Sequence, residues 1–528
     1  MLLSVQPISK QKIQLFLLCL ASSLLTACDI PNADISGKIT YDNVSHNETT
    51  DGLEYTKLQQ SPIRGVRVEA IENGKVITSD ITDDQGNYKI VVKMDKFITL
   101  RVRSEFALGA ENVLGATKIV DNTNQQAVYV LESNEFEVKR EQLTRNLNAS
   151  SGWNGTEYVG TRAAAPFHIL DRIYDIHAKL STIDQTINMP ELMINWSVNN
   201  VAESGDRETG QIGTSFYQNG EIFLLGAADA DTDEYDGHVI IHEWGHFFED
   251  TLSRSDSIGG PHAGGDRLDP RVAFGEGFGN AWSAIITDDP FYRDSFGARQ
   301  ESGFSINVEA NDTINPGWYS EGSVQSILYD LYDDFTDDAD TFSLGLEPIY
   351  NVLIGAQKDS EAFTSIFTFM TYILENNPAE SANFEALLKA QNISPAIDIW
   401  GSKAANDANE PNSLPVYIEL NPTDRQNICT SAAFGTTGNK LANHRFIKLN
   451  IPSSGNYSLT VTPNSRHDVD AYLYQHGELL ALNEDAGIEP LTLSFDAQEG
   501  VLVADTLAYD EAGSAISAAC YDVALTQN

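Results

Sequence analysis

Positive charge is scarce in this chain of 528 residues, which has 33 Lys and Arg against 76 Asp and Glu and a formal net charge of -43. Nucleic-acid binding depends on cationic side chains that neutralise phosphates, so this balance excludes nucleic acid as a partner. The acidic residues are spread along the chain, which is typical of a heavily solvated surface. With 41% hydrophobic residues the chain is not disordered. Its length predicts about three folding units.

Long hydrophobic runs are also lacking, and the apolar run at residues 13–25 is too short to span a bilayer comfortably. It follows Lys10 and Lys12 and leads into a Leu-Thr-Ala-Cys sequence that ends at Cys28. These features resemble a bacterial lipoprotein signal. The resemblance implies that residues 1–28 are the signal peptide and that Cys28 is lipidated. The protein is then expected to be extracytoplasmic and lipid-anchored to a bacterial membrane.

Cysteine is rare, with four in the whole chain. Cys19 lies in the predicted signal peptide and Cys28 would carry lipid, which leaves Cys429 and Cys520. In an oxidising compartment these two are predicted to form a disulfide. The closed loop of roughly 90 residues would stabilise the fold by about 4–5 kcal/mol in the chain-entropy model.

Short alternating strands fill the segment from residue 29 to residue 140, and Glu72-Asn73-Gly74 predicts a hairpin turn. A second acidic, glycine-containing turn at residues 82–87 precedes another alternating strand. The segment resembles the carboxypeptidase regulatory-like β-sandwich. That resemblance implies an accessory domain without catalytic residues of its own.

Helical periodicity begins after residue 148 and continues to residue 400, mixed with strand-like pieces at residues 192–198 and 221–225. This mixture predicts an α+β domain of the size of a catalytic unit. Residues 401–415 are polar, contain two prolines and are interpreted as a linker. Alternating strands return in residues 416–528, where residues 468–474 resemble the strand signature of the bacterial pre-peptidase C-terminal domain, a β-sandwich.

His242-Glu243-Trp244-Gly245-His246 is the most informative pentapeptide. Two imidazoles four residues apart project from one helix face and can share a tetrahedral metal, with Glu243 beside it. A bound Zn²⁺ lowers the pKa of its water toward about 7, and the carboxylate can take the proton as the water attacks a carbonyl. The apolar residues around the motif predict a buried helix, in which two histidines without a ligand would be costly. His238 lies one turn earlier and is interpreted as structural.

A hydrolytic zinc needs a third protein ligand. The metzincin continuation fails, because Glu249 and Leu252 stand where glycine and histidine are needed. Residues 275–282, Gly-Glu-Gly-Phe-Gly-Asn-Ala-Trp, resemble the glutamate-bearing helix of fungalysin and thermolysin-like peptidases, the gluzincins. The resemblance makes Glu276 the third ligand of one catalytic zinc.

Four residues after that glutamate, gluzincins carry an aspartate that holds a zinc-bound histidine, and this chain has Asn280 instead. An amide can orient the ring, but it adds no negative charge. His262 and Asp266, in a glycine-rich loop before Glu276, remain competing candidates for the third ligand.

Tyr319 opens a predicted helix within Tyr-Ser-Glu-Gly and resembles the Tyr-x-x-Gly element of the aminopeptidase branch of gluzincins. The resemblance implies that Tyr319 stabilises the oxyanion, and an aromatic helix cap is the alternative. Residues 220–226 are expected to form the edge strand on which a substrate peptide is laid.

The acidic segment at residues 229–236 could bind Ca²⁺, but it fails as an EF-hand loop because Glu234 and Ile240 stand at the sixth and twelfth positions. A solvated loop with Asp236 near the helix start is the favoured interpretation.

The sequence therefore predicts a multidomain chain with an α+β, zincin-like catalytic domain flanked by two all-β sandwiches. The predicted activity is zinc-dependent hydrolysis of a polypeptide substrate. Endopeptidase and aminopeptidase activity are both open. The competing hypothesis is a non-catalytic adhesin or polymer-binding lipoprotein with a degenerate peptidase scaffold.

Overall fold

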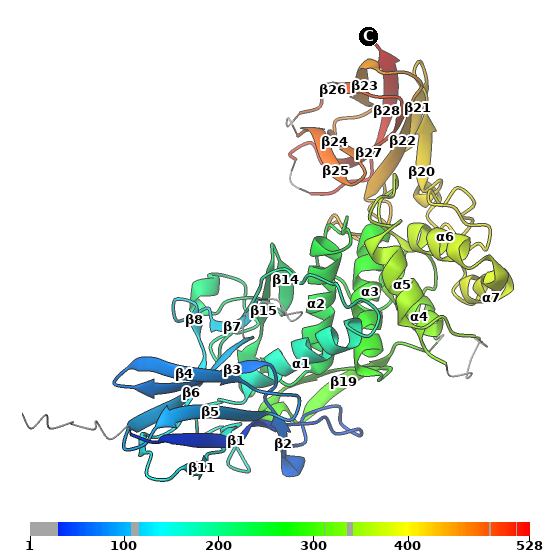
Figure 1. Cartoon of the computed structure of the whole chain (residues 1–528). Helices are drawn as coiled ribbons and strands as arrows, with labels where there is room; N and C mark the ends of the chain where they lie inside the picture. Colours follow the sequence, from blue (N-terminus) through cyan, green and yellow to red (C-terminus); the bar gives the residue numbers. More distant parts are fainter. Residues whose placement is uncertain (1–29, 107–115, 311, 335–341, 485–486, 514) are drawn as a thin grey trace, which may run out of the picture.

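The computed structural model describes residues 30–106, 116–310, 312–334, 342–484, 487–513 and 515–528. The predicted signal peptide and Cys28 lie outside the described residues. No helix in these ranges combines the length and the apolar character that a membrane crossing requires. Figure 1 shows β-sheets at one end of the molecule, helices in the middle and a second β-rich unit at the other end. The multidomain α+β class that the sequence predicts is confirmed.

The N-terminal sheets are built around two long strands, β1 and β6. β1 pairs with β5, β2, β11 and β12, while β6 pairs with β3, and β3 with β4. The predicted hairpin turn is confirmed, because Glu72 pairs with Lys75 and both Asn73 and Gly74 have positive φ. The strands are β1 (Asn32–Asn43), β2 (Gln59–Pro62), β3 (Val66–Glu72), β4 (Lys75–Ile81), β5 (Asn87–Lys93), β6 (Phe97–Phe106), β7 (Thr117–Asp121), β8 (Ala127–Val128), β9 (Val130–Glu132), β10 (Phe136–Glu137), β11 (Gln142–Thr144) and β12 (Leu147–Ala149).

One sheet continues from the N-terminal part into the central region, in the order β14-β15-β13-β7-β6-β3-β4. β13 (Leu192–Trp196) pairs in parallel with both β7 and β15 (Glu221–Leu224). One hydrophobic cluster accordingly contains residues of both parts and extends from Ala33 to Ala442. The N-terminal sheets therefore support the scaffold on which the central helices pack.

The expectation that residues 220–226 form an edge strand is wrong. β15 lies between β13 and β14 (Phe216–Gln218), so the short β14 is the edge. The physical reason is a hairpin: Asn219 and Gly220 both have positive φ, and Gln218 pairs with Glu221 across the turn.

Seven α-helices are described, and two of them, α2 and α3, carry the predicted metal ligands (Figure 1). α2 packs against α3, and α3 packs against α4. The helices are α1 (Ala165–Leu180), α2 (Gly237–Thr251), α3 (Pro270–Thr287), α4 (Glu321–Tyr332), α5 (Leu346–Ile354), α6 (Ile366–Asn376) and α7 (Ser381–Ala390). A four-stranded sheet lies beside them and contains β16 (Gly226–Ala227), β17 (Asp231–Thr232), β18 (Phe291–Phe296) and β19 (Ser302–Asn307).

The C-terminal unit has one sheet in the order β20-β22-β27-β24-β25 and a second in the order β21-β28-β23-β26, with its own hydrophobic cluster. The predicted disulfide between Cys429 and Cys520 is present. It joins neighbouring strands of one sheet, β21 and β28, rather than the first and last strands of the unit. The strands are β20 (Tyr417–Leu420), β21 (Arg425–Cys429), β22 (His444–Ile451), β23 (Gly455–Pro463), β24 (Asp468–Gln475), β25 (Glu478–Asn483), β26 (Leu491–Ala497), β27 (Gly500–Tyr509) and β28 (Cys520–Gln527).

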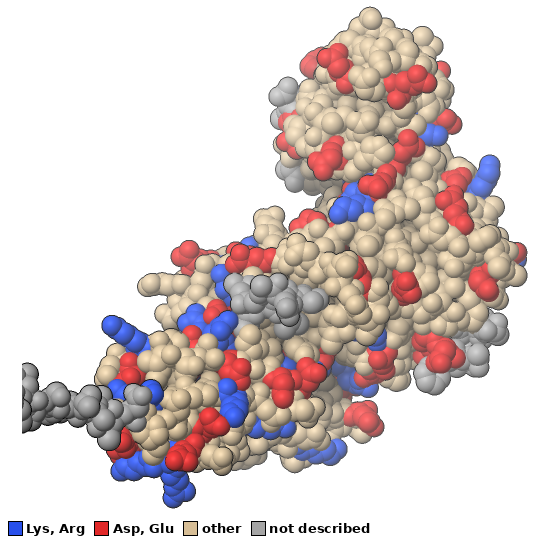
Figure 2. Space-filling view, in the orientation of Figure 1, with Lys and Arg blue, Asp and Glu red and all other residues tan. Residues whose placement is uncertain are grey.

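Acidic side chains are scattered over the helical and C-terminal parts of the face in Figure 2, whereas Lys and Arg gather mainly over the N-terminal sheets. This distribution agrees with a solvated acidic surface and shows no basic stripe on that face.

Candidate metal centre

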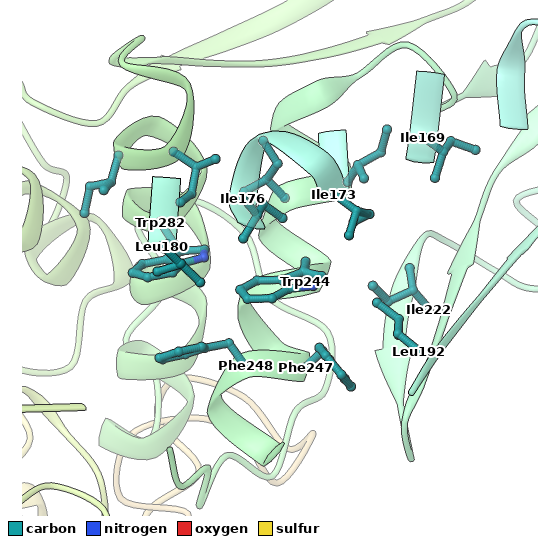
Figure 3. Close-up of a cluster of buried hydrophobic side chains, with 14 of the residues drawn as sticks. Ile169, Ile173, Ile176, Leu180, Leu192, Ile222, Trp244, Phe247, Phe248 and Trp282 are labelled. Carbon is teal, nitrogen blue, oxygen red and sulfur yellow. The ribbon is translucent and has the colours of Figure 1, made fainter. Parts of the chain in front are cut away.

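Helix α2 carries the histidine pair and is buried along almost its whole length. Trp244 is fully buried and its ring is parallel to that of Trp282 on α3, with centroids 6.4 Å apart. Phe248 stacks on Trp282 with centroids 5.0 Å apart. Figure 3 shows these aromatic rings between α2 and α3, with isoleucines of α1 on their other side. Aromatic packing therefore fixes the face of α2 that is opposite to His242 and His246.

Helix α3 begins with two sequence signals, an Asp269 side chain that accepts the Arg271 backbone N–H and Pro270 in the first turn. It then continues with small residues at its contacts. A Cβ atom on Gly279 would lie 2.7 Å from His242 Nδ1, and one on Gly277 would lie 2.6 Å from the carbonyl oxygen of Glu321. Glycine at these two positions lets α2 and α4 approach α3 closely and brings Glu276 to the histidines.

The structure brings His242, His246 and Glu276 together, with donor atoms that lie within 4.8 Å of one another. Nε2 of His242 lies 3.1 Å from Nε2 of His246, and Oε2 of Glu276 lies 3.4 Å and 3.6 Å from these two nitrogens. Tetrahedral zinc with bonds of about 2.0–2.2 Å places its ligand atoms about 3.3–3.6 Å apart. The three residues therefore fit one zinc ion.

The outer nitrogens of both imidazoles face oxygen acceptors. Nδ1 of His242 lies 2.9 Å from Oδ1 of Asn280, and Nδ1 of His246 lies 3.7 Å from Oε2 of Glu249. A proton on Nδ1 leaves a lone pair on Nε2, which points into the cluster in both residues. Two lone pairs 3.1 Å apart repel each other unless a proton or a cation lies between them.

Burial would lower the pKa of His246, but the nearby Glu276 and Glu249 raise it well above its usual value. Burial would likewise raise the pKa of Glu276, and His246 and His242 hold it well below its usual value. These shifts favour an ionised Glu276 beside a protonated imidazole of His246. A divalent cation would use the same carboxylate but needs the neutral imidazole, so it would take the place of that proton.

Glu243 is buried on the same turn of α2, and its charge contributes to the raised pKa values of His246 and of Tyr292 on β18. The ring of Tyr292 lies edge-on to that of His242, with centroids 6.1 Å apart. His238 is directed elsewhere, with Nδ1 3.2 Å from Oγ of Ser283.

Tyr319 is buried at the end of the segment before α4. Its hydroxyl donates to Oδ1 of Asn406 at 3.0 Å and lies 3.5 Å from the carbonyl oxygen of Pro316. Asn406 belongs to the segment interpreted as a linker. Among the described residues this hydroxyl therefore bonds to Asn406 and lies near Pro316, and no hydrogen bond joins it to the three clustered residues.

The two competing ligand candidates separate in the structure. Nε2 of His262 lies 3.3 Å from Oε2 of Glu276 and 3.6 Å from Oε2 of Glu321. Oδ2 of Asp266 instead accepts from Lys440 Nζ at 2.9 Å and from the backbone N–H of Ala263 at 3.1 Å. The loop thus places one imidazole at the cluster and directs the aspartate toward the C-terminal unit.

Sequence reasoning missed three carboxylate or amide groups around the cluster. Glu249, Glu321 and Gln325 are buried, and Gln325 Oε1 accepts from Nδ2 of Asn280 at 3.0 Å. Glu249 follows the last histidine of the His-Glu-x-x-His motif by three positions, and Glu321 lies inside the Tyr-Ser-Glu-Gly motif. Their spacing gave a weak signal, because their roles depend on how the three helices pack.

The acidic segment before α2 divides between two environments. Glu234 pairs with Arg162, and Asp236 precedes α2 but accepts hydrogen bonds from Ser295 rather than from the helix. Asp231 and Asp233 instead face Asp294 of β18, with oxygen atoms within 4.8 Å of one another. The Ca²⁺ hypothesis for this segment stays a prediction.

The cluster of two histidines on α2 and a glutamate on α3, the helix that packs against α2, resembles the metal centre of a zincin. Residues 179–386 match the family model of the Mycolysin C-terminal domain, a fungalysin/thermolysin-like peptidase region. The matched segment contains His242, His246 and Glu276. No curated protein matches the chain.

Two solved structures are similar to this chain at low scores. The pre-peptidase C-terminal domain of a collagenase from Bacillus anthracis is 12% identical, with 21% of this chain and 94% of that chain covered and a TM-score of 0.17. A cycloisomaltooligosaccharide glucanotransferase from Paenibacillus sp. is 10% identical, with 93% of this chain and 72% of that chain covered and a TM-score of 0.13. Neither likeness carries an argument about this protein.

Proposed function

We propose that the protein is a zinc metallopeptidase that hydrolyses peptide bonds of polypeptide substrates, with His242, His246 and Glu276 as ligands of one zinc ion. The observation that carries the proposal is the triangle of donor atoms, whose sides of 3.1, 3.4 and 3.6 Å suit a tetrahedral metal. The match of residues 179–386 to a peptidase family supports it.

Zinc at this centre would supply a Lewis acid that acidifies water and polarises a peptide carbonyl. In this proposal Glu243 takes the proton of the attacking water and returns it to the leaving amine. Asn280 would hold the ring of His242 in the orientation that directs Nε2 inward, and the carboxylate of Glu249, 3.7 Å from Nδ1 of His246, would favour a proton on that nitrogen by its charge. These residues act through position and charge, which the buried helices α2 and α3 fix before a substrate binds.

Tyr319 is proposed to stabilise the oxyanion, as its motif implies. To do so its hydroxyl must exchange its hydrogen bond with Asn406 for one with the substrate. Tyr319→Phe removes the hydroxyl and keeps the ring. A loss of kcat of about 100-fold at unchanged zinc content would support this role, and an unchanged kcat would remove it.

The deciding experiment compares wild type, Glu243→Gln and Glu276→Ala by metal mass spectrometry and casein cleavage in the same samples. We expect one zinc per wild-type chain, zinc retention without cleavage in Glu243→Gln, and zinc loss in Glu276→Ala. Glu499→Gln, an exposed glutamate on the C-terminal unit, is the matched control. A wild-type chain that holds no zinc would overturn the proposal. Polymer binding that is insensitive to Glu243→Gln would favour the adhesin.

We also propose that Cys28 anchors the protein to a bacterial membrane through lipid on the extracytoplasmic side. The support is the resemblance of residues 1–28 to a lipoprotein signal. Radiolabelled palmitate should enter wild type and not Cys28→Ser, and the wild-type chain should partition into detergent. Equal labelling of both would sink this proposal.

A further inference from the structure

The loop between α2 and α3 is held by the C-terminal unit. The carbonyl oxygen of Pro261 accepts from Lys440 Nζ at 2.7 Å and from Asn439 Nδ2 at 3.1 Å. Backbone bonds continue the contact, from Leu441 N–H to Arg267 O and from Asp269 N–H to Asn439 O, both at 2.9 Å. Residues 439–441 thus form a clasp across the loop.

Two side chains of the clasp, Lys440 and Asn439, donate to Pro261, the residue directly before His262. Nδ1 of His262 lies 3.1 Å from the carbonyl oxygen of Gly260, which can only accept, so this nitrogen carries a proton. Nε2 is thereby directed to Glu276 and Glu321, at 3.3 and 3.6 Å. The His262 side chain is 30% exposed, whereas those of Glu276 and Glu321 are 9% exposed. His262 therefore lies on the solvent side of the metal centre, where a substrate would arrive.

The loop needs an external tether because its own sequence does not fix it. Glycines lie on both sides of His262, and Gly260 and Gly265 have φ values of +106° and +87°. Glycine-rich backbone has high conformational entropy, so an untethered loop would sample many positions of the imidazole. The Lys440 side chain is 9% exposed, and ion pairs that are partly buried are screened less than surface pairs.

We propose that Lys440 and Asn439 are positioning residues that hold His262 at the metal centre, so that the centre is complete only with the C-terminal unit docked. The inference rests on the proposed peptidase function. Held in this place, Nε2 of His262 faces the carboxylates of Glu276 and Glu321, so the imidazole positions these two side chains at the metal centre. The same clasp turns Asp266 away, because Lys440 takes its carboxylate.

The first test needs no turnover. Hydrogen–deuterium exchange of residues 258–266 is measured on the full metal-free chain of wild type, Lys440→Met, Lys440→Arg and Arg425→Met. Arg425 pairs with Asp522 on the same C-terminal unit and is 64% exposed, which makes it a matched control. We expect Lys440→Met to accelerate exchange about tenfold, with the arginine rescue and the control close to wild type. Equal exchange in all four chains would overturn the clasp.

The second test separates positioning from general stability with a double-mutant cycle. Lys440→Met should lower kcat/KM about tenfold in the wild-type background and have no further effect in a His262→Ala background. Zinc affinity is measured in parallel, and an equal loss of cleavage in both backgrounds would overturn the role of Lys440 through His262. A wild-type chain without zinc-dependent cleavage would count against the proposed function, while the exchange experiment would still decide the clasp.

Discussion

Oδ1 of Asn280 lies 2.9 Å from Nδ1 of His242, and the amide group of the same asparagine donates to Gln325 at 3.0 Å. The second bond fixes which end of the amide faces the histidine. An oxygen that only accepts requires the proton of His242 on Nδ1, so the metal-facing Nε2 keeps its lone pair. A neutral amide thus orients the ring without the charge that a carboxylate would add.

Asn280→Ala should lower zinc affinity about 10- to 100-fold, because the ring of His242 loses its orienting partner. Asn280→Asp keeps the acceptor and adds a negative charge, so it should bind zinc at least as tightly as wild type. Competition with a chromophoric chelator measures both. Asn195→Ala, which removes a buried asparagine of β13, controls for general destabilisation. Identical affinities in Asn280→Ala and wild type would contradict the role of Asn280.

Gly279→Ala should disrupt the centre by contact alone. The added methyl group would lie 2.7 Å from Nδ1 and 2.8 Å from Cε1 of His242, so the ring or the two helices must shift. We expect a loss of about 1–3 kcal/mol in the free energy of unfolding, together with weaker zinc binding. Urea unfolding and zinc titration check the two effects. Gly264→Ala meets no atom within 4 Å, so a comparable loss there would show that the argument is wrong.

Arg271 joins the helix of Glu276 to the C-terminal unit. Its guanidinium lies 2.9 Å from both Asp269 and Asp505, and its Cζ lies 4.9 Å and 4.6 Å from the ring centroids of Phe363 and Phe446. Arg271→Met leaves the buried Asp269 without its cation and Asp505 with His444 alone, which should cost about 3–5 kcal/mol. We expect earlier unfolding in urea and faster proteolysis between residues 401 and 415. The exposed pair of Arg425 and Asp522 is the comparison, since its disruption should cost about 0–1 kcal/mol.

The local parts of the centre could be predicted from the sequence. His242 and His246 are four residues apart on one helix, and Glu276 and Asn280 repeat that spacing on another, so each pair follows from helix geometry alone. The hairpin at Asn219 and Gly220 was equally readable, since Asn-Gly is a strong turn signal, but the strand before it was overlooked.

Long-range contacts could not be predicted. His262, Glu321 and Lys440 come from a loop, a helix start and another unit, and no periodicity links them. The parallel pairing of β7 with β13 joins Thr117 to Leu192, and nothing in either strand specifies the other. Such contacts are selected by the packing of the whole chain rather than by local propensity.

The carboxylates of β17 and β18 should make stability depend on pH. Burial, with repulsion by Asp236 and Asp231, raises the pKa of Asp294 to about 8, and burial with Asp236 raises that of Asp231 to about 6. An unfolded aspartate has a pKa of about 3.9, so between about pH 4 and pH 8 the folded chain holds protons that the unfolded chain has lost. Because the folded state binds more protons, its stability should fall as pH rises through this window.

Asp294→Asn removes the carboxyl whose pKa is raised to about 8 and should remove much of this fall. A chelator is present, so that no divalent cation neutralises the cluster. Under this condition the Tm of the variant minus that of wild type should be larger at pH 8 than at pH 5 by at least about 2 °C. Differential scanning fluorimetry at both pH values measures the difference, and Glu499→Gln should show no such gain. A constant difference between Asp294→Asn and wild type would mean that Asp294 is already ionised at pH 5. In that case burial and the acidic neighbours would not hold its pKa near 8.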